Sequence, residues 1–479
     1  MGQEILTSRF KKQDFEAFET RLREETAALH DWFAVDRFAQ ASGIGGFELE
    51  AWLIDDAGYP LPANEAYLAR LANPLVVPEL SVFNVEFNTP HLALRGDALS
   101  RMHAALQQIW TECYRTAAEL GGKLAMIGIL PTVRKEDLTV ENMSRMVRYR
   151  ALNEQVLRMR RGKPLQLNIR GRELLRTEHH GVMLEAATTS FQIHLQVPQR
   201  DAVSVFNAAL LLSAPMVAAS ANSPFLFGKD LWEETRIPVF EQAVAVVTEE
   251  GDAQVTRPRV TFGNDYVHTS LFELFEENLA HYPLLLPMCM DEPLAHLSHL
   301  RLHNGTIWRW NRPLIGFDRD GIPHLRIENR VVPAGPSIPD AIANSALLYG
   351  LVTAMSRQQP EAATRLSFAQ VRENFYTAAR TGLEAEIDWI HGKRVLLRQL
   401  LLEELLPLAR TGLESLGIDR DDIDTYLGII KARVSTGRTG AGWQRAFAAR
   451  HGRDLSALTL AYVERQQSGL PVHEWGLTC

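Results

Sequence analysis

The sequence of 479 residues contains little cysteine and lacks several motifs that mark common enzyme classes. Its three cysteines, Cys113, Cys289 and Cys479, lie far apart and form no CxxC pair. This spacing argues against a structural zinc site and favours a reducing compartment. The sequence also contains no GxxxxGK[ST] phosphate-binding loop and no GxSxG nucleophile elbow. A bound nucleotide would therefore be held by other groups, and no serine nucleophile is indicated.

The sequence also has no excess of positive charge. The formal net charge is −8 and the pI is near 6.0, which argues against a nucleic-acid-binding role. The first residues are charged and lack the apolar core of a signal peptide, so we expect a cytoplasmic protein. Residues 202–228 contain no charge, but prolines and polar residues interrupt them. Because a membrane span needs about 20 mostly apolar residues, we predict instead a buried core helix that ends in a turn at residues 222–224.

Half-buried β-strands with polar side chains on one face are the most informative feature that is present. Alternate side chains of a strand share a face. Four segments alternate in this way, residues 47–53, 82–88, 191–197 and 324–331, and their polar residues include Glu48, Glu50, Glu86, Gln192, His194, Glu328 and Arg330. If the four strands share one sheet, its wet face is dense with oxygen ligands. Such a face suits hard divalent cations and the phosphates that they bind.

The acidic residues strengthen this interpretation when they are taken together. Glu48 and Glu50 alone form a weak signal, because many exposed strands alternate acidic and apolar residues. Glu79 and Glu86 are separated by an odd number of positions and would point to opposite faces of a flat strand. Pro78 places Glu79 in the preceding loop, from which it could reach the same site. Four clustered glutamates repel one another unless cations lie among them or some stay protonated.

The wider pattern predicts an α+β fold with a mainly antiparallel sheet, because the strands lack a regular βαβ rhythm. We divide the chain into a helical segment at 1–40, a core at 41–385 and a helical extension at 386–479, which includes an amphipathic helical run at 387–416. The oligomeric state stays open, and a homo-oligomer is one option. The extension is compatible with a dimer interface or with a cover over an active-site mouth.

Two segments resemble the opening of the type-2 glutamate–cysteine ligase family. They read Gly46-Phe-Glu48-Leu-Glu50 and Pro78-Glu79-Leu80 through Val85-Glu86-Phe87-Asn88-Thr89-Pro90. Further matches follow in the family's order: Ser220-Ala-Asn222-Ser-Pro224-Phe, Thr235-Arg236, Arg259-Val-Thr-Phe262-Gly263, Arg326-Ile-Glu328-Asn-Arg330, and Glu373-Asn374 through Ala379-Arg380-Thr-Gly382-Leu383. The family resembled consists of ATP-dependent carboxylate–amine ligases. The resemblance implies a glutamine-synthetase-like core, in which a curved sheet has helices on one face.

The resemblance also implies two magnesium sites. Glu50, Glu79 and Glu86 match acids that hold one Mg²⁺ near the substrate carboxylate and the transferred phosphoryl group. Glu48 and Glu328 match acids that hold a second Mg²⁺ against the phosphates of ATP. Two divalent ions orient triphosphate oxygens and neutralise the charge that develops during transfer.

The remaining site residues follow from the same resemblance. Arg330 matches an arginine that contacts phosphate, and Arg236 falls where the family has a basic residue beside the substrate pocket. Many members carry His-x-His on the third strand, whereas this chain has Gln192 before His194. We interpret Gln192 as a ligand of the second metal, because an amide carbonyl is a reasonable oxygen ligand. His194 is interpreted as a nucleotide-side contact, with a hydrogen-bonded structural histidine as an equal alternative.

The implied reaction has two steps and belongs to glutathione biosynthesis. A carboxylate, the γ-carboxylate of glutamate by resemblance, attacks the γ-phosphorus of ATP. An amine such as cysteine then attacks the acyl phosphate and gives an amide and phosphate. Neither the carboxylate nor the amine is identified by the sequence.

Two other functions were weighed against the ligase. A guanidine-kinase-like phosphotransferase could use the same fold, and a stable phosphorylated acceptor would distinguish it from a ligase. A catalytically silent binding protein is the second alternative, suggested by the departure at Gln192. Such a protein would have no physical need to keep the acidic residues together.

Two further clusters contain candidate binding residues. Residues 142–176 are rich in arginine, and Arg150 is our first choice there for binding phosphate or a substrate carboxylate. Most surface arginines are solvated or weakly paired. Trp308 and Trp310 stand beside Arg309 and Arg312 and could stack on a nucleotide, although large aromatic residues more often pack in the core.

Overall fold

A mixed α/β architecture surrounds one central sheet in the computed structural model of the chain, which describes residues 5, 7–250, 253–362 and 365–478. The strand order of the sheet is β15-β16-β8-β1-β3-β2, and its strand pairs are antiparallel. The strands are β1 (Ile44–Ile54), β2 (Val76–Pro78), β3 (Asn84–Asn88), β8 (Phe191–Val197), β15 (Asn311–Phe317) and β16 (Pro323–Asn329), and β4 (Leu92–Ala93) and β5 (Lys123–Ala125) also pair with β1. The four predicted strands are thus neighbours in one sheet, and the predicted fold class is confirmed.

The two faces of this sheet differ in the way that the alternation of the sequence predicts. Leu49 on β1 and Ile193 on β8 are completely buried. Two long helices, α5 (Gln199–Ser220) and α9 (Ile338–Gln358), pack against β8. Helix α3 (Ala98–Glu119) packs against α9. The glutamates project from the other face, which is free to form a site.

Helices α5 and α9 are both long and apolar enough to cross a membrane if length and composition alone are considered. Within the protein, however, 89% and 100% of their most apolar windows are buried. Core helices of globular proteins show the same combination. The predicted buried helix within 202–228 is α5, and it ends at Ser220, just before the expected turn.

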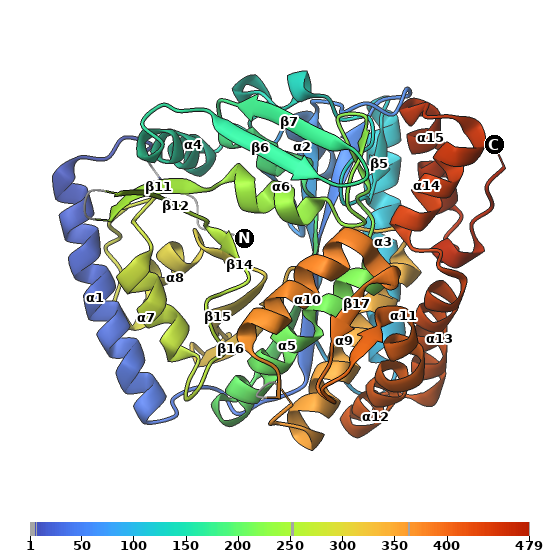
Figure 1. Cartoon of the computed structure of the whole chain (residues 1–479). Helices are drawn as coiled ribbons and strands as arrows, with labels where there is room; N and C mark the ends of the chain where they lie inside the picture. The colour runs from blue at the N-terminus through green and yellow to red at the C-terminus, as the bar shows by residue number, and fades with distance from the viewer. Residues whose placement is uncertain (1–4, 6, 251–252, 363–364, 479) are drawn as a thin grey trace.

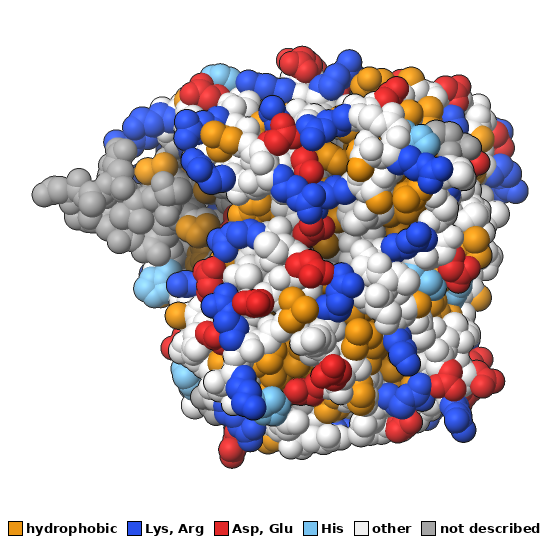
Figure 2. Space-filling view, turned by 45° about the vertical axis from the view of Figure 1, so that its right-hand side comes forward, with side chains coloured by type: hydrophobic (Ala, Val, Ile, Leu, Met, Phe, Trp, Pro, Cys, Tyr) orange, Lys and Arg blue, Asp and Glu red, His pale blue; other side chains and the backbone are white. Residues whose placement is uncertain are grey.

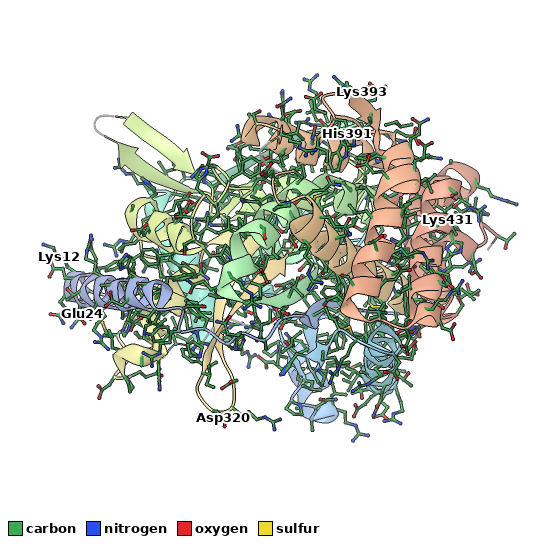
Figure 3. All side chains as sticks on the ribbon, turned by 90° about the horizontal axis from the view of Figure 1, so that it is seen from below. Lys12, Glu24, Asp320, His391, Lys393 and Lys431 are labelled. Atoms are coloured by element: carbon green, nitrogen blue, oxygen red, sulfur yellow. The ribbon has the colours of Figure 1, made fainter. Side chains whose placement is uncertain are left out.

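Helix α1 (Lys12–Ala34) lies on the opposite side of the molecule and supports a short helix next to the site (Figure 1). Glu25 on α1 is buried and accepts hydrogen bonds from Nδ1 of His299, at 2.7 Å, and from the amide of Leu300, at 2.8 Å. Both partners belong to α8 (Ser298–Asn304). The outer face of α1 carries Lys12 and Glu24, which point away from the body in Figure 3.

The remaining elements extend the sheet and its helical cover. The other helices are α2 (Asn64–Leu71), α4 (Val147–Met159), α6 (Arg236–Ala243), α7 (Phe272–His281), α10 (Phe368–Thr381), α11 (Leu397–Leu400), α12 (Leu406–Leu416), α13 (Arg420–Thr436), α14 (Gly440–His451) and α15 (Leu455–Gln467). Two-stranded sheets are formed by β6 (Leu165–Arg170) with β7 (Leu174–His179), β9 (Phe225–Leu226) with β10 (Lys229–Asp230), β11 (Val246–Glu250) with β12 (Ala253–Arg257), β13 (Val260–Thr261) with β14 (Trp308–Arg309), and β17 (Glu386–Asp388) with β18 (Arg394–Leu396).

The predicted helical run at 387–416 is wrong at its start. Residues 386–396 form the hairpin of β17 and β18, and the helical segment begins only at Leu397. His391 and Lys393 lie in the turn of this hairpin (Figure 3), where Gly392 has a φ of 69°. Asn374 on α10 bonds both the amide and the carbonyl of Asp388, which holds β17 extended. This tertiary contact outweighs the local apolar periodicity.

The C-terminal helices are bound to the core by a buried ion pair. Arg433 on α13 donates to Asp340 on α9 at 2.7 Å and to Asn344 at 2.6 Å, and both charged side chains are almost completely buried. The second carboxylate oxygen of Asp340 accepts a hydrogen bond from the amide of Val472 at 2.8 Å. These contacts join residues from three distant parts of the chain.

We expect Arg433→Ala to lower the free energy of unfolding by about 3–5 kcal/mol, because it leaves Asp340 buried without its cation. Urea unfolding followed by tryptophan fluorescence measures this change. Arg410→Ala is the matched control, since the pair of Arg410 with Asp424 is exposed and should contribute less than about 1 kcal/mol. Equal, small losses for both variants would contradict the structural role of the buried pair.

Candidate active site

A cavity of about 510 Å³ opens on the polar face of the sheet. Its walls come from β1, β3, β8, β15 and β16, from α4 and α8, and from the loops between them. The predicted residues that line it are Glu48, Glu50, Glu79, Glu86, Gln192, Glu328 and Arg330. On the outer face drawn in Figure 2, by contrast, acidic and basic side chains are interspersed. Among the described residues, seven glutamates and five arginines line the cavity.

One group of carboxylates lies at the junction of β1, β2 and β3. Glu50 on β1 is directly opposite Glu86 on β3 in the strand register. Glu79 follows the last residue of β2 and joins them from the loop, as its position after Pro78 predicts. One oxygen from each of the three carboxylates lies within 4.8 Å of the others. We call these three residues the first ligand group.

Local hydrogen bonds hold the carboxylate of Glu50 in place. Its two oxygens accept from the amide and from the hydroxyl of Ser190, both at 2.8 Å. The Gln192 side-chain amide also donates to Glu50, at 3.0 Å. Because Ser190 directly precedes β8, the beginning of that strand positions the acid on β1.

A second group of candidate metal ligands lies on the neighbouring strands β1, β8 and β16 of the same sheet. Glu48 on β1, His194 on β8 and Glu328 on β16 bring one ligand atom each within 4.8 Å of the others. Nε2 of His194 is 3.6 Å from Glu48 and 3.8 Å from Glu328. Among the described residues, neither ring nitrogen of His194 has a hydrogen-bond partner, although both are buried. We call these three residues the second ligand group.

Two arginines neutralise the carboxylate of Glu328. Arg312 on β15 binds it through two nitrogens, each at 2.9 Å, and Arg330 adds a third bond at 3.0 Å. Arg330 also donates to the amide oxygen of Gln192. Gln192 thus bridges Glu50 and Arg330, and His194 is a member of the second ligand group. The assignment of Gln192 as a ligand of the second metal stays a prediction.

The electrostatics of the two groups are opposite. Burial, followed by the charge of Glu79, raises the pKa of Glu50 to about 7 from its usual 4.5. Burial and the neighbouring glutamates also raise the pKa of Glu86 well above its usual value. Burial acts in the same direction on Glu328, but Arg312 and Arg330 outweigh it and hold its pKa well below the usual range. The first ligand group therefore lacks positive charge, which a divalent cation would supply.

The imidazole of His194 is kept neutral. Burial lowers its pKa, although Glu48 and Glu328 act in the opposite direction. Neutral imidazole is the form that binds metals. Its two ring nitrogens without hydrogen bonds and the nearby carboxylate oxygens therefore fit a divalent cation.

Arg236 lies behind the wall of the cavity. It is 1% exposed and is not among the described residues that line the cavity, so any contact with a substrate at this position stays a prediction. Its guanidinium pairs with Glu234 at 3.2 Å and donates to the main-chain carbonyls of Arg330 and Val331 at 3.0 and 2.7 Å. The side chain lies over the ring of Trp310. Arg236 therefore supports the segment that carries Arg330 from behind.

The arginine-rich segment contributes a different residue from the one predicted. Arg148 on α4 lines the cavity, whereas Arg150 is exposed. Arg148 donates to the hydroxyl of Tyr149 at 2.6 Å, and this hydroxyl lies 3.5 Å from Glu79. Since Arg148 and Leu152 are four residues apart and both line the cavity, helical spacing could have indicated the correct arginine.

The two tryptophans of the aromatic cluster differ in position: one lies where it could stack on a nucleotide, and the other packs in the core. Trp308 lines the cavity, while Trp310 is 1% exposed and packs in the core. Arg312 belongs to the site, but Arg309 is buried against Glu277 and Asn278.

Glu185, which also lines the cavity, was missed by the sequence analysis. Burial and the charges of Glu79 and Glu50 raise its pKa well above the usual value. It lies in a short 3-10 helix outside the alternating strand pattern, so no sequence signal marked it. In the part of the chain that the structure describes, no residue after Arg330 lines the cavity. The C-terminal extension therefore does not form its mouth.

Comparison with known proteins agrees with this geometry. The profile of glutamate-cysteine ligase family 2 matches residues 44–460, and the chain belongs to this family. It is 25% identical over 421 residues to a Rubrobacter xylanophilus protein named as a candidate glutamate–cysteine ligase 2-3, and the match covers 85% of this chain and 93% of that protein. The chain is therefore an enzyme of the glutamate–cysteine ligase type, within the ATP-dependent ligases.

Two crystal structures share the fold. A glutamate–cysteine ligase from Francisella tularensis in complex with AMP superposes with a TM-score of 0.55 at 11% identity, covering 92% of this chain and 91% of that one. A bifunctional glutathione synthetase from Pasteurella multocida gives a TM-score of 0.54 at 12% identity, covering 92% of this chain and 55% of that one.

The raised pKa of Glu50 predicts a pH-dependent stability. In the folded, metal-free protein the carboxyl holds its proton to about pH 7, compared with 4.5 ordinarily. Its contribution is therefore present at low pH and is lost as the pH rises through about 7. Glu50→Gln removes this titration, so the Tm of wild type relative to the variant should fall between about pH 5 and about pH 8.

Divalent cations should oppose the fall of the wild-type Tm with rising pH, because protons compete with the metal for the same carboxylates. We expect Mg²⁺ or Mn²⁺ to raise the Tm of wild type more at about pH 8 than at about pH 5. Scanning calorimetry with and without metal tests both expectations. The same metal-induced shift in Glu50→Gln would show that the cation binds elsewhere.

Proposed function

We propose that this enzyme joins the γ-carboxylate of glutamate to an amine, such as cysteine, by way of an acyl phosphate, using ATP and two Mg²⁺ ions. The observation that carries the proposal is the pair of ligand groups on adjacent strands of one sheet. Glu48 and Glu50 belong to different groups and are two residues apart on β1, so their backbones are separated by roughly 6.6 Å. The two acids that would each hold one of the ions are thus neighbours on one face of β1.

The residues present would hold one Mg²⁺ at the first ligand group and one at the second. When bound, these ions would align the phosphate oxygens of ATP with the donor carboxylate and neutralise charge that develops on them. Arg312 and Arg330 lie beside the second ligand group, where a triphosphate would be placed. Arginine is well suited to contact phosphate oxygens.

In the first step, an oxygen of the donor carboxylate attacks the γ-phosphorus of ATP. A bond between carboxylate oxygen and phosphorus forms, and the bond from that phosphorus to the β-phosphate oxygen breaks, so ADP leaves. Negative charge builds on the transferred group, and the guanidinium of Arg330 would stabilise it. Arg236 would act indirectly, through the two carbonyls that it binds next to Arg330.

In the second step, the unprotonated amine attacks the carbonyl carbon of the acyl phosphate. The new C–N bond replaces the C–O bond to phosphate, inorganic phosphate leaves, and the nitrogen loses a proton. Water competes with the amine for the acyl phosphate, so the site must exclude it. The burial of the first ligand group meets this need, because Glu50 and Glu86 are 8% and 2% exposed.

Incubation with ATP, Mg²⁺, glutamate and a panel of amines, with products read by mass, tests the proposal. We expect ADP, phosphate and a γ-glutamyl amide in equal amounts. Glu50→Ala should reduce turnover by at least about a thousandfold, since the first ligand group loses its central carboxylate. Glu119→Ala, which removes an exposed acid paired with Arg70, should have no effect. A stable phosphorylated acceptor without amide would contradict the ligase assignment.

The division of labour between the ligand groups can be tested separately. Glu328→Gln should raise the KM for ATP by about tenfold or more while changing the KM for glutamate little, because it weakens only the second ligand group and its arginines. Steady-state kinetics with each substrate varied in turn gives both constants. Equal increases in the two constants would contradict the assignment of separate sites.

A further inference from the structure

Two arginines that line the cavity, Arg326 and Arg301, form no hydrogen bond or ion pair with another described side chain. Arg326 is on β16, and its Nε is buried without a hydrogen-bond partner among the described residues. Arg301 is on α8 and is more exposed, with its guanidinium over the ring of Phe317. The two guanidinium groups are close enough for their charges to interact. Because neighbouring cations repel, this pair indicates a site for an anion.

The strand register places Arg326 at one end of a row of functional groups. Arg326 is opposite Gln196 on β8, and Glu328 of the second ligand group is opposite His194. Ser190, which holds an acid of the first ligand group, is six residues before Gln196, a distance of roughly 20 Å along the strand. The second ligand group therefore lies between the first ligand group and Arg326.

This order fits a polyphosphate better than it fits the donor amino acid. The donor carboxylate must reach the first ligand group, where it receives the phosphoryl group. An amino acid as short as glutamate cannot also extend from there to Arg326. The phosphate chain of ATP, by contrast, extends away from the transferred group and past the second ligand group. The phosphates that remain in ADP would then lie next to Arg326.

The charges around the second ligand group favour the same occupant. Three arginines lie near its two carboxylates: Arg312, Arg326 and Arg330. With a divalent cation bound as proposed, the positive charges exceed the carboxylates by three. The phosphate chain of a nucleotide supplies negative charge that balances this excess.

Apolar side chains line the cavity next to the two arginines. Leu314 on β15 is directly opposite Arg326 in the strand register and therefore shares its face of the sheet. Leu300 and Leu302 flank Arg301 on α8, and all three leucines line the cavity. Ligand pockets combine apolar walls with a few charged groups in this way. A nucleoside attached to the phosphates would thus find apolar surface beside them.

We propose that Arg326, together with Arg301, binds the two phosphates of ATP that remain in ADP. The inference rests on the proposed function for the direction in which the nucleotide lies along the sheet, and it adds two binding residues to that function. Arginine suits this role, because its planar guanidinium binds phosphate oxygens through two nitrogens at once.

Calorimetric titration with MgADP tests the proposal without turnover. Arg326→Gln should raise the Kd for MgADP by about tenfold or more, because it removes hydrogen bonds to a charged group. Arg301→Gln should raise it by about two- to fivefold, since an exposed charge contributes less. The Kd for adenosine, which has no phosphate, and the KM for glutamate should change by less than about twofold in either variant.

Arg319→Gln is the matched control. Arg319 is exposed in the turn between β15 and β16 and is not among the described residues that line the cavity, so the Kd for MgADP should not change. Arg326→Lys keeps the charge but loses the planar fork, and we expect a Kd between those of wild type and Arg326→Gln. If Arg326→Gln does not fold, the lysine variant and Arg301→Gln still test the proposal.

An unchanged Kd for MgADP in Arg326→Gln would overturn the inference. Equal weakening of MgADP and adenosine would also overturn it, as would a rise in the KM for glutamate alone. If Arg326→Gln weakens MgADP as expected but wild type forms no γ-glutamyl amide, the proposed function fails and the phosphate contact stands. If the amide forms and Arg326→Gln binds MgADP normally, only the inference fails.

Discussion

The repulsion between carboxylates that are brought together out of water is the constraint on which this structure depends. At Glu328 two arginines of the protein, Arg312 and Arg330, bind the carboxylate and offset this repulsion. At Glu50 and Glu86, burial and the neighbouring carboxylates raise the pKa, so both acids hold their protons more tightly than usual, and the hydrogen bonds from Ser190 only partly oppose this at Glu50. The carboxylate of Glu328 in the second ligand group is thus neutralised by arginines, whereas the carboxylates of the first ligand group would be neutralised by cations from solution.

A rigid frame keeps these unfavourable groups together. Helices α5 and α9 cover the back of the sheet, and the hydroxyl of Tyr349 on α9 bonds the carbonyls of Gly46 and His194, at 3.1 and 3.2 Å. The C-terminal helices add stability from behind through the pair of Arg433 and Asp340. Favourable packing far from the cavity therefore offsets the cost of concentrating charge within it.

The strand alternation was enough to predict the sheet and most acids of the site, because a period of two is a property of the backbone itself. The partners of each side chain were not predictable in this way. Gln192 and His194 share a face, yet one bridges Glu50 and Arg330 while the other joins Glu48 and Glu328. Arg236 points to main-chain carbonyls that are distant in sequence. Glu185 and the β17–β18 hairpin depend on tertiary contacts that leave no local periodic signal.

Strand β1 pairs with β3 on one side and with β8 on the other, and it contributes one acid to each ligand group. A slip of a single residue in its pairing would turn Glu48 and Glu50 together toward the apolar layer and bring Leu49 to the cavity. An insertion or deletion within β1 that shifts its pairing by one residue would therefore remove both ligand groups at once, whereas a point substitution removes a ligand from one group alone.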